Sequence, residues 1–464
     1  MTAERTARDG GERAADLHQP LAGIISLGCS KNLVDTEYLM GGLARSGWGF
    51  TPTKGKADLL LVNTCSFLEA SVEESQTAIE EALRWKKRRR GRIVVVAGCI
   101  VSRFGRELER AHPKVDLFLL PGQIPRLSGW LGSPPPRPRI LSGGGPSYLP
   151  RQGEERIVTS AFWSYLKVSD GCTNRCSYCL IPTIRGEHRS RSLRSLRLEA
   201  RSLVAAGMRE INLVGQDLTR WGEDRRGGGL VQLVKGLASL PGDFRLRLLY
   251  LHPSRVDGEI ARLLAGGEKV FPYLDMPIQH ASTRVLKAMN RHYGRPGLER
   301  IHSMLRRLAP GIALRTTVMV GYPGEGRREF RELLGFLRDF PFENLGAFVF
   351  DPQEGTPASR LEKKVRPEEA RDRYRAVMEQ QQSLSAELWK GRRGSETEAL
   401  AIYPADKAGT RWIGRTAWQA PEVDGQIVIE GTARPGSLVP VRITGSSAYD
   451  LKGVILQEKT PRPS

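Results

Sequence analysis

Short, continuous apolar runs alternate with longer amphipathic stretches through most of the chain. Apolar strands separated by helices are typical of a parallel sheet that is covered on both faces and connected by right-handed crossovers. The first region repeats one layout, in which an apolar strand, a turn and a cysteine precede a helical pattern; its strands are residues 24–28, 59–64 and 94–98. We therefore expect a parallel α/β domain with three cysteines at the carboxyl edge of its sheet.

The middle region continues the alternation with six further strand patterns. They are residues 164–170, 210–215, 245–251, 272–278, 313–321 and 345–350. Six strand-plus-helix units predict an open, incomplete (β/α)6 barrel, whose site would lie at the carboxyl ends of the strands. Beyond residue 390 the pattern changes to short alternating segments at 398–403, 425–431 and 437–443, which predict a small antiparallel β domain.

These changes divide an α/β chain into five segments. Residues 1–20 are polar and mixed in charge, which predicts a disordered tail. Residues 132–146 are rich in proline and glycine, which is typical of a linker between domains. The remaining bounds follow from the patterns: a first domain at 21–131, a linker at 132–154, a central domain at 155–390 and a final domain at 391–460.

Composition narrows the class of protein. The chain has 464 residues, of which 40% are hydrophobic and 26% are charged, as in soluble globular proteins of two or three domains. No run is long enough to cross a membrane, so we expect a cytoplasmic protein. In that reducing compartment the six cysteines favour ligand or catalytic roles over disulfides. The net charge of +20 favours an acidic partner, usually nucleic acid or a ribonucleoprotein.

The strongest chemical signal is the loop GCTNRCSYC, which carries Cys172, Cys176 and Cys179. Three thiolates on a short loop hold three irons of a 4Fe-4S cluster and leave the fourth iron open. S-adenosylmethionine fills such a vacancy in radical enzymes, where an electron from the cluster cleaves the cofactor. Two other hypotheses stay open: a structural zinc site completed by His188, and cysteines that only pack as small apolar residues.

Cys29, Cys65 and Cys99 carry less information one by one, because a single cysteine is more often a packed core residue. Their repetition at three successive strand ends changes that interpretation. Three convergent thiols are again sufficient for a 4Fe-4S cluster with one open iron. No cysteine of the chain is then without a role.

With these motifs in view, the sequence resembles the methylthiotransferase family of radical S-adenosylmethionine enzymes, over nearly the whole chain after residue 20. Further matching stretches begin at Ile181 (IPTIRGEHRSRS), Val214 (VGQDLTRWG), Pro277 (PIQHASTRVLKAMNR) and Val320 (VGYPGE). The sequence departs from the family's usual wording at residues 98–104 (GCIVSRF), where a polar stretch is more common after the third cysteine. We assign no individual cofactor contacts from these short motifs.

The resemblance implies a fold and a reaction. The three domains would be an amino-terminal cluster domain, a radical barrel and a small OB-like β domain called TRAM. One 4Fe-4S cluster would be held by Cys29, Cys65 and Cys99 and a second by Cys172, Cys176 and Cys179. The enzyme would insert sulfur into a carbon–hydrogen bond and methylate it. S-adenosylmethionine would serve as methyl donor and as radical source, and an electron donor protein would be a partner.

Within the family one branch modifies an adenosine of tRNA, and another modifies the β-carbon of an aspartate in small-subunit ribosomal protein S twelve. Residues 28–37 (GCSKNLVDTE), 248–253 (LLYLHP) and 277–282 (PIQHAS) resemble the ribosomal branch. Residues 391–464 hold ten Lys or Arg against eight Asp or Glu, whereas a domain that grips tRNA phosphates should be strongly basic. We therefore expect the ribosomal substrate, free or on the subunit, with tRNA as the alternative.

A third hypothesis is a zinc-stabilised RNA-binding adaptor without catalysis, although six strand-plus-helix units usually carry an active site. The most basic run, residues 84–92 (RWKKRRRGR), has seven positive residues of nine. It ends a helical pattern that begins with Glu69, so the helix dipole accounts for it without a partner. Contact with ribosomal RNA is the lesser hypothesis for this run.

Overall fold

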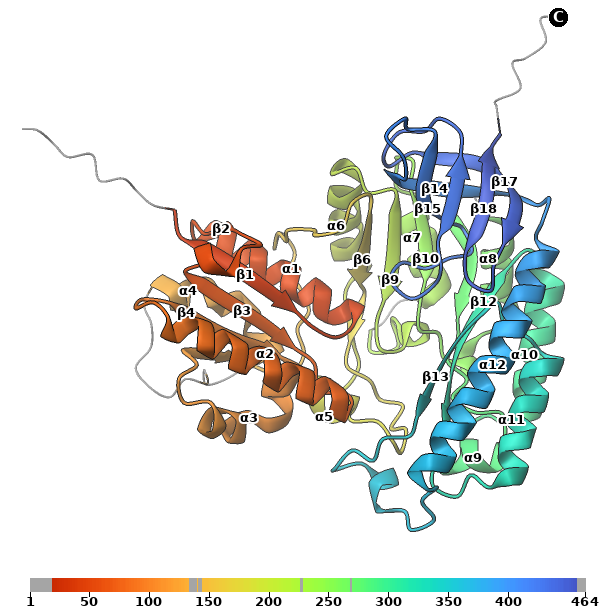
Figure 1. Cartoon of the computed structure of the whole chain (residues 1–464), viewed down its shortest axis with the longest axis horizontal. Helices are drawn as coiled ribbons and strands as arrows, with labels where there is room; N and C mark the ends of the chain where they lie inside the picture. Colours follow the sequence, from red (N-terminus) through yellow and green to blue (C-terminus); the bar gives the residue numbers. More distant parts are fainter. Residues whose placement is uncertain (1–18, 133–139, 141–143, 226–227, 268, 457–464) are drawn as a thin grey trace, which may run out of the picture.

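The structure, a computed structural model, describes residues 19–132, 140, 144–225, 228–267 and 269–456. Residues 1–18 of the expected tail, and residues 133–139 and 141–143 of the expected linker, lie outside the described residues. The described chain forms an amino-terminal α/β domain, a central α/β domain and a small β-barrel (Figure 1). The predicted fold class is confirmed, whereas the domain bounds proposed from the sequence stay predictions.

The first sheet contains five parallel strands in the order β2-β1-β3-β4-β5. Strands β3 and β4 are almost entirely buried, because α1 packs on one face of the sheet and α2 on the other. The sequence missed β2 and β5. The strands are β1 Leu21–Ser26, β2 Gly49–Phe50, β3 Leu59–Thr64, β4 Ile93–Gly98 and β5 Leu117–Leu119. The helices are α1 Ser30–Arg45, η1 Lys54–Lys56, α2 Glu69–Lys87, α3 Cys99–Ala111, η2 Pro121–Arg126 and α4 Leu127–Gly132.

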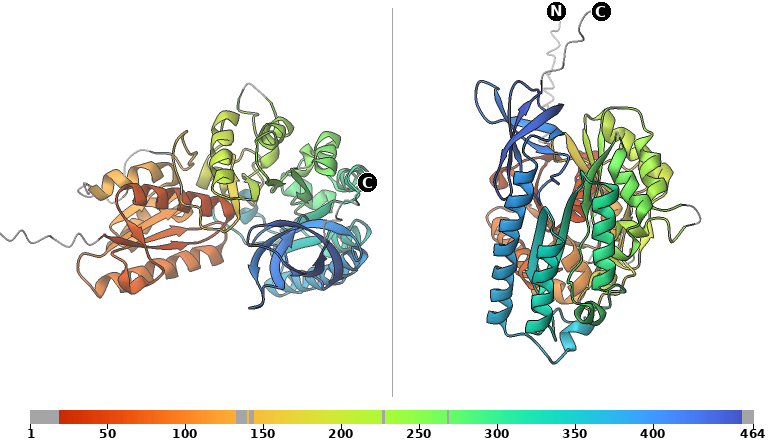
Figure 2. Two further views of the ribbon diagram at one scale, coloured as in Figure 1. Left: turned by 90° about the horizontal axis from the view of Figure 1, so that it is seen from above. Right: turned by 90° about the vertical axis from the view of Figure 1, so that its right-hand side faces the viewer.

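The central sheet has six parallel strands in the order β13-β12-β11-β10-β9-β6, which confirms all six predicted strands. The strand order follows the chain and the ends do not pair, so the barrel is incomplete; helices cover its outer face (Figure 2). The strands are β6 Trp163–Lys167, β9 Glu210–Val214, β10 Arg245–Leu248, β11 Val270–Asp275, β12 Ala313–Val320 and β13 Asn344–Val349. A short hairpin is formed by β7 Ser169–Asp170 and β8 Arg189–Ser190.

The helices of the central domain follow the strands in turn. Several begin at side-chain caps. At the start of α6, Ser192 Oγ accepts a hydrogen bond from Ser195 N at 3.2 Å, and at the start of α8 the Asp257 carboxylate accepts hydrogen bonds from backbone N–H groups. The helices are α5 Ile181–Arg185, α6 Leu193–Ala205, η3 Leu218–Arg220, α7 Leu230–Ala238, η4 Pro253–Arg255, α8 Gly258–Gly266, α9 Thr283–Ala288, α10 Arg295–Leu308, α11 Arg327–Asp339, η5 Pro357–Arg360 and α12 Pro367–Gly391.

The carboxyl-terminal domain is a closed barrel of five strands, seen end-on in the left view of Figure 2. The sequence predicted three of these strands and an antiparallel arrangement. Four of the strand pairs are antiparallel, but β16 and β18 are parallel, and that pair closes the barrel. The strands are β14 Glu396–Pro404, β15 Arg411–Thr416, β16 Ile427–Glu430, β17 Leu438–Ser446 and β18 Leu451–Ile455.

The small barrel packs against the beginnings of the central strands. Glu210, the first residue of β9, is buried between Arg247 at 2.8 Å and Arg415 of the small barrel at 2.7 Å. Arg245, the first residue of β10, pairs with Glu398 at 2.6 Å. The opposite, carboxyl ends of the central strands are therefore left for the site.

Internal contacts account for much of the basic run at residues 84–92. Lys86 pairs with Asp116 at 2.5 Å, and Arg89 pairs with Asp58 at 2.5 Å. Arg92 donates to a backbone carbonyl of α2 at 2.7 Å. These contacts support the interpretation of the run as a structural helix end. Separately, the described part of the chain contains no helix long and apolar enough to cross a membrane.

Candidate active site

The three cysteines of the first domain follow the carboxyl ends of neighbouring strands. Cys29 follows β1 and precedes α1, Cys65 follows β3, and Cys99 follows β4 and begins α3. Since β1, β3 and β4 are adjacent and parallel, these ends meet at one edge of the sheet. All three side chains line one cavity of about 540 Å³. Two of them lie at helix N termini, where the positive end of the helix dipole favours a thiolate.

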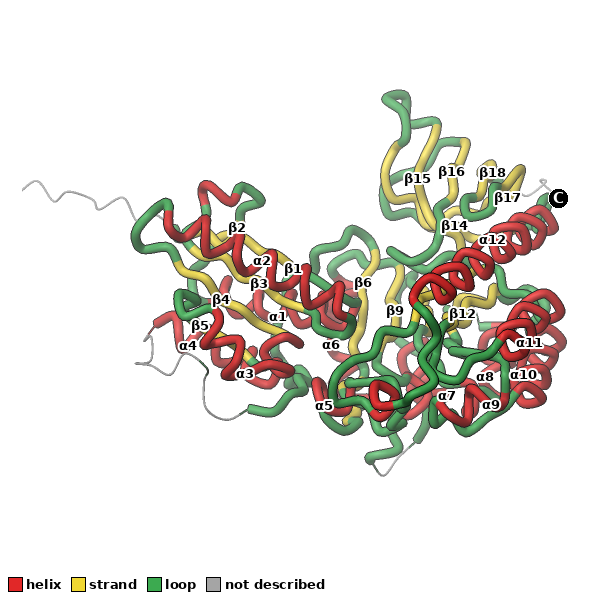
Figure 3. The backbone as a smooth tube through the Cα atoms, turned by 60° about the horizontal axis from the view of Figure 1, so that its bottom comes forward, coloured by secondary structure: helices red, strands yellow, loops and turns green. Residues whose placement is uncertain are grey.

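The other three cysteines lie on the loop between β7 and α5 (Figure 3). Cys172, Cys176 and Cys179 line the same cavity of about 540 Å³. The loop is preceded by Gly171, whose φ is +77° and whose Cβ, if it had one, would lie 2.1 Å from the carbonyl oxygen of Glu187. Only glycine fits this close approach of two backbones. The tight turn fixes where the cysteine loop begins.

The two sets of cysteines therefore share one cavity, to which both sheets turn the carboxyl ends of their strands. The helix that ends the cysteine loop, α5, packs against α3 of the first domain (Figure 3). Loops and strand ends of the central sheet add polar side chains to the wall, among them Gln216, Asp217, Tyr250, His252, Gln279 and Thr317. The arrangement combines six thiols with hydrogen-bonding groups in one chamber.

Three cations accompany the thiols. Lys31 and Arg185 lie near the first set, and Arg291 donates a hydrogen bond to Cys176 Sγ at 3.4 Å. Burial raises the pKa of Cys99 to about 12. Burial also raises the pKa of Cys29, but the charges of Lys31 and Arg185 outweigh it, and the pKa ends below its usual value. Positive charge at both sets favours the thiolates that bind iron.

Strained backbone conformations occur in the wall of the cavity. Tyr250 and Gln279, which both line it, have φ of +64° and +66°. Arg175, in the cysteine loop, has φ +51°, and its carbonyl accepts a hydrogen bond from the side chain of Asn290 at 2.7 Å. Non-glycine residues in this region cost about 1–3 kcal/mol each and gather at ligand sites.

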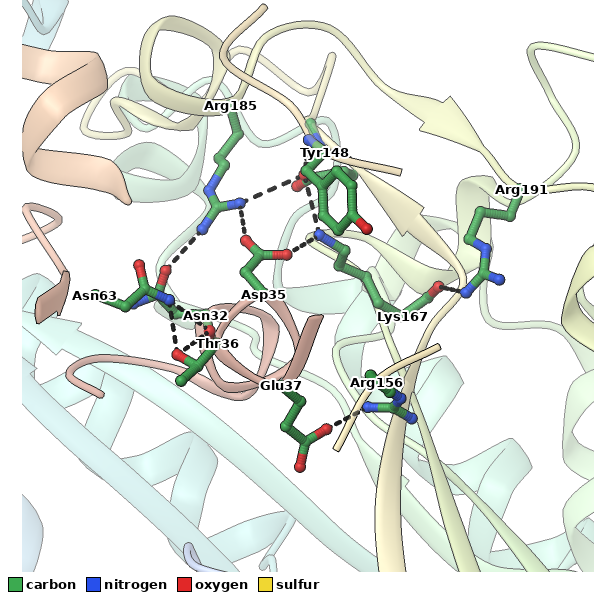
Figure 4. A network of polar contacts seen from close by, with 12 residues as sticks. Asn32, Asp35, Thr36, Glu37, Asn63, Tyr148, Arg156, Lys167, Arg185 and Arg191 are labelled. Atoms are coloured by element: carbon green, nitrogen blue, oxygen red, sulfur yellow. Dashed lines mark hydrogen bonds and ion pairs between the residues drawn. The ribbon is translucent and has the colours of Figure 1, made fainter. Parts of the chain in front are cut away.

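A buried network joins the two domains beside the cavity (Figure 4). Asp35 of α1 contacts both Lys167 of β6 and Arg185 of α5, the latter at 2.6 Å. Asp170 lies 3.4 Å from each of the same two cations, and Arg185 also donates to Asn32 at 3.0 Å. The side chains of the four charged residues are at most 2% exposed. Two buried cations and two buried carboxylates thus hold the cysteine sets in register.

Two further contacts join the same domains. Arg156, which precedes β6, binds Glu37 of α1 at 2.5 Å (Figure 4). It also binds Glu199 of α6 at 3.0 Å. Arg103 of α3 donates a hydrogen bond to Gln353, which follows β13, at 2.7 Å. These contacts also join the first domain to the central domain.

His188, the proposed fourth zinc ligand, does not line the cavity. Its Nε2 lies 3.1 Å from Ser190 Oγ and 3.9 Å from a carboxylate oxygen of Asp224. Within the described residues, no three His, Cys, Asp or Glu side chains are grouped to hold a single metal ion. Three thiols in each set match the number of protein ligands of a 4Fe-4S cluster that has one open iron.

The sequence motifs contained several cavity residues that were not singled out. Lys31 follows Cys29 by two positions, Arg185 lies in the stretch from Ile181, and Arg291 ends the stretch from Pro277. For Lys31 and Arg185, a cation close to a cysteine in the sequence was the available signal, whereas no cysteine lies near Arg291 in the sequence. The direction of these side chains toward the cavity is set by the tertiary fold.

Other motif residues have structural roles. In the stretch VGYPGE, Glu325 binds Arg373 of α12 at 2.9 Å and lies outside the cavity wall. In the unusual stretch GCIVSRF, Ile100 and Val101 are fully buried against α2 and the sheet. The apolar residues that follow Cys99 therefore belong to the core of the first domain.

Comparisons with known proteins match three successive stretches of the chain. The family described as "Uncharacterized protein family UPF0004" matches residues 22–120, the Radical SAM superfamily matches residues 166–337, and the TRAM domain matches residues 394–456. A protein of Dictyoglomus thermophilum named "Ribosomal protein uS12 methylthiotransferase RimO" is 42% identical over 441 residues, which cover 94% of this chain and 99% of the relative. The chain belongs to the radical S-adenosylmethionine methylthiotransferase family.

Further comparisons support membership of this family. A protein of Geobacter sulfurreducens with the same name is 40% identical over 439 residues, covering 93% of this chain and 98% of the relative. Among solved structures, the radical S-adenosylmethionine methyltransferase TsrM from Kitasatospora setae superposes with a TM-score of 0.55 at 16% identity, over 73% of this chain and 77% of that chain. The latter likeness concerns the fold alone.

The methylthiotransferase is therefore an enzyme that uses S-adenosylmethionine and 4Fe-4S chemistry. The hypothesis of a zinc-stabilised adaptor without catalysis is wrong. The two sets of three thiols, with cations beside them, supply the donor type that iron–sulfur clusters require.

Proposed function

We propose that this methylthiotransferase inserts sulfur and a methyl group at the β-carbon of an aspartate in ribosomal protein uS12, with two 4Fe-4S clusters. The observation that carries the proposal is the single cavity of about 540 Å³ lined by two separate sets of three cysteines. Cys29, Cys65 and Cys99 would hold one cluster. Cys172, Cys176 and Cys179 would hold the other.

When bound, the second cluster would supply the electron that cleaves S-adenosylmethionine, and the first would carry the sulfur. The chain's own residues keep the two sites close and oriented. Asp35 and Arg185 fix the domains across the cavity, and Arg291 donates to Cys176 at 3.4 Å. An unactivated β-carbon is too weakly acidic for a side-chain base, so a radical must remove the hydrogen atom.

Three observations support uS12 as the substrate. The two relatives described above carry uS12 in their names. The stretches 28–37 and 248–253, which resemble the ribosomal branch, both contribute side chains to the cavity wall. Residues 391–464 hold ten Lys or Arg against eight Asp or Glu, and this nearly neutral balance does not favour binding to tRNA phosphates. Such a reaction belongs in the cytoplasm and needs an electron donor protein.

Iron counting tests the two-cluster proposal. After anaerobic reconstitution with iron and sulfide, the wild-type chain should hold about eight irons, because each cluster has four. Replacing all three cysteines of either set by alanine should leave about four. Recombinant uS12 should gain a methylthio group with the wild type and with neither triple variant.

Two results would contradict the proposal. Wild-type protein that retains about four irons, unaffected by loss of Cys29, Cys65 and Cys99, would exclude the first cluster. Unmodified uS12 beside tRNA that gains a methylthio-adenosine would shift the function to the alternative substrate.

A further inference from the structure

Lys31 extends from the first domain across the cavity to the central domain. It lies in the first turn of α1, two residues after Cys29, and its side chain lines the cavity. Its ammonium nitrogen is 3.6 Å from the centre of the Tyr250 ring, which belongs to the loop after β10. Lys31 is 8% exposed. A cation–π contact of this kind orients the ammonium group.

The other cations of the cavity wall are already engaged. Arg185 binds Asp35 at 2.6 Å, and Arg291 donates to Tyr293 at 2.8 Å and to Cys176 at 3.4 Å. Lys31, by contrast, has no carboxylate within 4.0 Å in the part of the chain that the structure describes. Cys29 and Asp275 act electrostatically on Lys31, and a buried ammonium group gains further from an anion in direct contact with it.

The aromatic ring that Lys31 contacts belongs to Tyr250, a residue with a strained backbone conformation. Tyr250 has φ +64°, a conformation that a bulky residue adopts only when its surroundings impose it. Two hydrogen bonds hold it there: its N–H donates to Asp275 at 3.1 Å, and its carbonyl accepts from Leu218 N at 3.0 Å. Asp275 is engaged in this way and also lies 3.6 Å from Arg315. Its carboxylate therefore supports Tyr250 and acts on Lys31 electrostatically, without a direct ion pair within 4.0 Å.

We propose that Lys31 determines substrate specificity by binding the side-chain carboxylate of the target aspartate. This inference rests on the proposed function. In aspartate the carboxylate is bonded directly to the β-carbon, so an ammonium that holds the carboxylate also fixes the carbon to be modified. The reaction replaces a hydrogen on that carbon and leaves the carboxylate intact, so the same contact serves substrate and product. An adenosine offers no carboxylate to Lys31.

The test compares two substrates on two enzymes. Reconstituted wild-type holoenzyme, Lys31→Met and Lys31→Gln are titrated with recombinant uS12 and with uS12 whose target aspartate is replaced by asparagine. The wild type should bind the aspartate form more tightly by on the order of 10- to 100-fold, the usual strength of a hydrogen bond to a charged group. Both variants should lose this preference by weakening only the aspartate form, and Lys31→Arg should restore part of it.

Controls separate this role from structural damage. Lys56→Met removes an exposed lysine of the same domain and should leave the preference intact. Iron content and the electron paramagnetic resonance spectra of the clusters should be the same in all of these proteins. Two neutral replacements, Lys31→Met and Lys31→Gln, are compared so that an effect of the new side chain is not mistaken for the loss of the charge.

Four outcomes would overturn the inference. In the first, Lys31→Met and Lys31→Gln retain the wild-type preference for the aspartate form. In the second, they retain it while the potential of one cluster shifts, which would make Lys31 a partner of the cluster. In the third, they retain it while S-adenosylmethionine binds more weakly. In the fourth, wild-type holoenzyme binds neither form of uS12, whether the protein is free or assembled in the small ribosomal subunit; this refutes the proposed function as well, and it is recognised before any variant is compared.

Discussion

Replacing Asp35 by asparagine should loosen the joint between the two cysteine-bearing domains. The wild-type network balances two cations, Lys167 and Arg185, against two carboxylates, Asp35 and Asp170. Asp35→Asn has nearly the same shape but leaves both buried cations to Asp170 alone, which lies 3.4 Å from each. The variant therefore carries one uncompensated positive charge in a region where the charged side chains are at most 2% exposed.

Two estimates of the cost agree. Removing one partner of a buried ion pair costs about 3–5 kcal/mol. Counted as contacts, Asp35 accepts hydrogen bonds from two charged donors, each of which contributes about 1.5–3 kcal/mol. The free energy needed to open the interface should therefore fall by about 3–5 kcal/mol.

Hydrogen exchange is the appropriate assay, because unfolding of a chain with several domains is not described by one two-state transition. Amides of α1 should exchange roughly 10²- to 10⁴-fold faster in Asp35→Asn. As a control, Glu81→Gln removes the partner of Lys54 in a pair that is about half exposed and 3.2 Å long, and it should change stability by less than about 1 kcal/mol. Equal, small effects of both substitutions would refute the role given to the network.

Three further predictions concern other parts of the fold. Glu210→Ala leaves two buried arginines without their carboxylate, and it should destabilise the contact between the small barrel and the central domain by about 3–5 kcal/mol, measured by hydrogen exchange of β15. Gly171→Ala places a Cβ 2.1 Å from the Glu187 carbonyl, and it should lower the iron retained on reconstitution by about four per chain, measured by metal analysis. Burial lowers the pKa of His302 from 6.5 to about 4, so its contribution to stability is complete above pH 6.5 and is lost as pH falls toward 4. His302→Gln should reduce the slope of stability against pH near pH 5 by about 1.4 kcal/mol per unit, measured by hydrogen exchange of α10 over that pH range.

Much of the architecture could be predicted from the sequence, because continuous apolar strands and the cysteines that follow them carry a strong local signal. Strands β3 and β4 are buried along almost their whole length, and Cys65 and Cys99 come directly after them. The short strands β2, Gly49–Phe50, and β5, Leu117–Leu119, have too few residues for any periodicity to appear. The parallel pair β16 and β18 was missed because alternation along a strand does not reveal the direction of its neighbour.

The contacts between the two domains and the backbone conformations at the cavity were harder to predict. Asp35 and Glu37 lie in a polar stretch that would suit an exposed helix face, yet both are at most 2% exposed because cations from another domain cover them. Tyr250 lies in an apolar run, and nothing in that run predicts its positive φ. Such features depend on partners more than a hundred residues away, as in the contact between Asp35 and Arg185.

The decisive measurement is the intact mass of uS12 from host cells with and without this gene. The proposed function predicts that uS12 from cells with the gene is heavier by one methylthio group replacing one hydrogen, and that the difference disappears when the gene is deleted. Identical masses of uS12 in both strains would contradict the assignment, and a methylthio-adenosine missing from the tRNA of the deletion strain would then identify tRNA as the substrate.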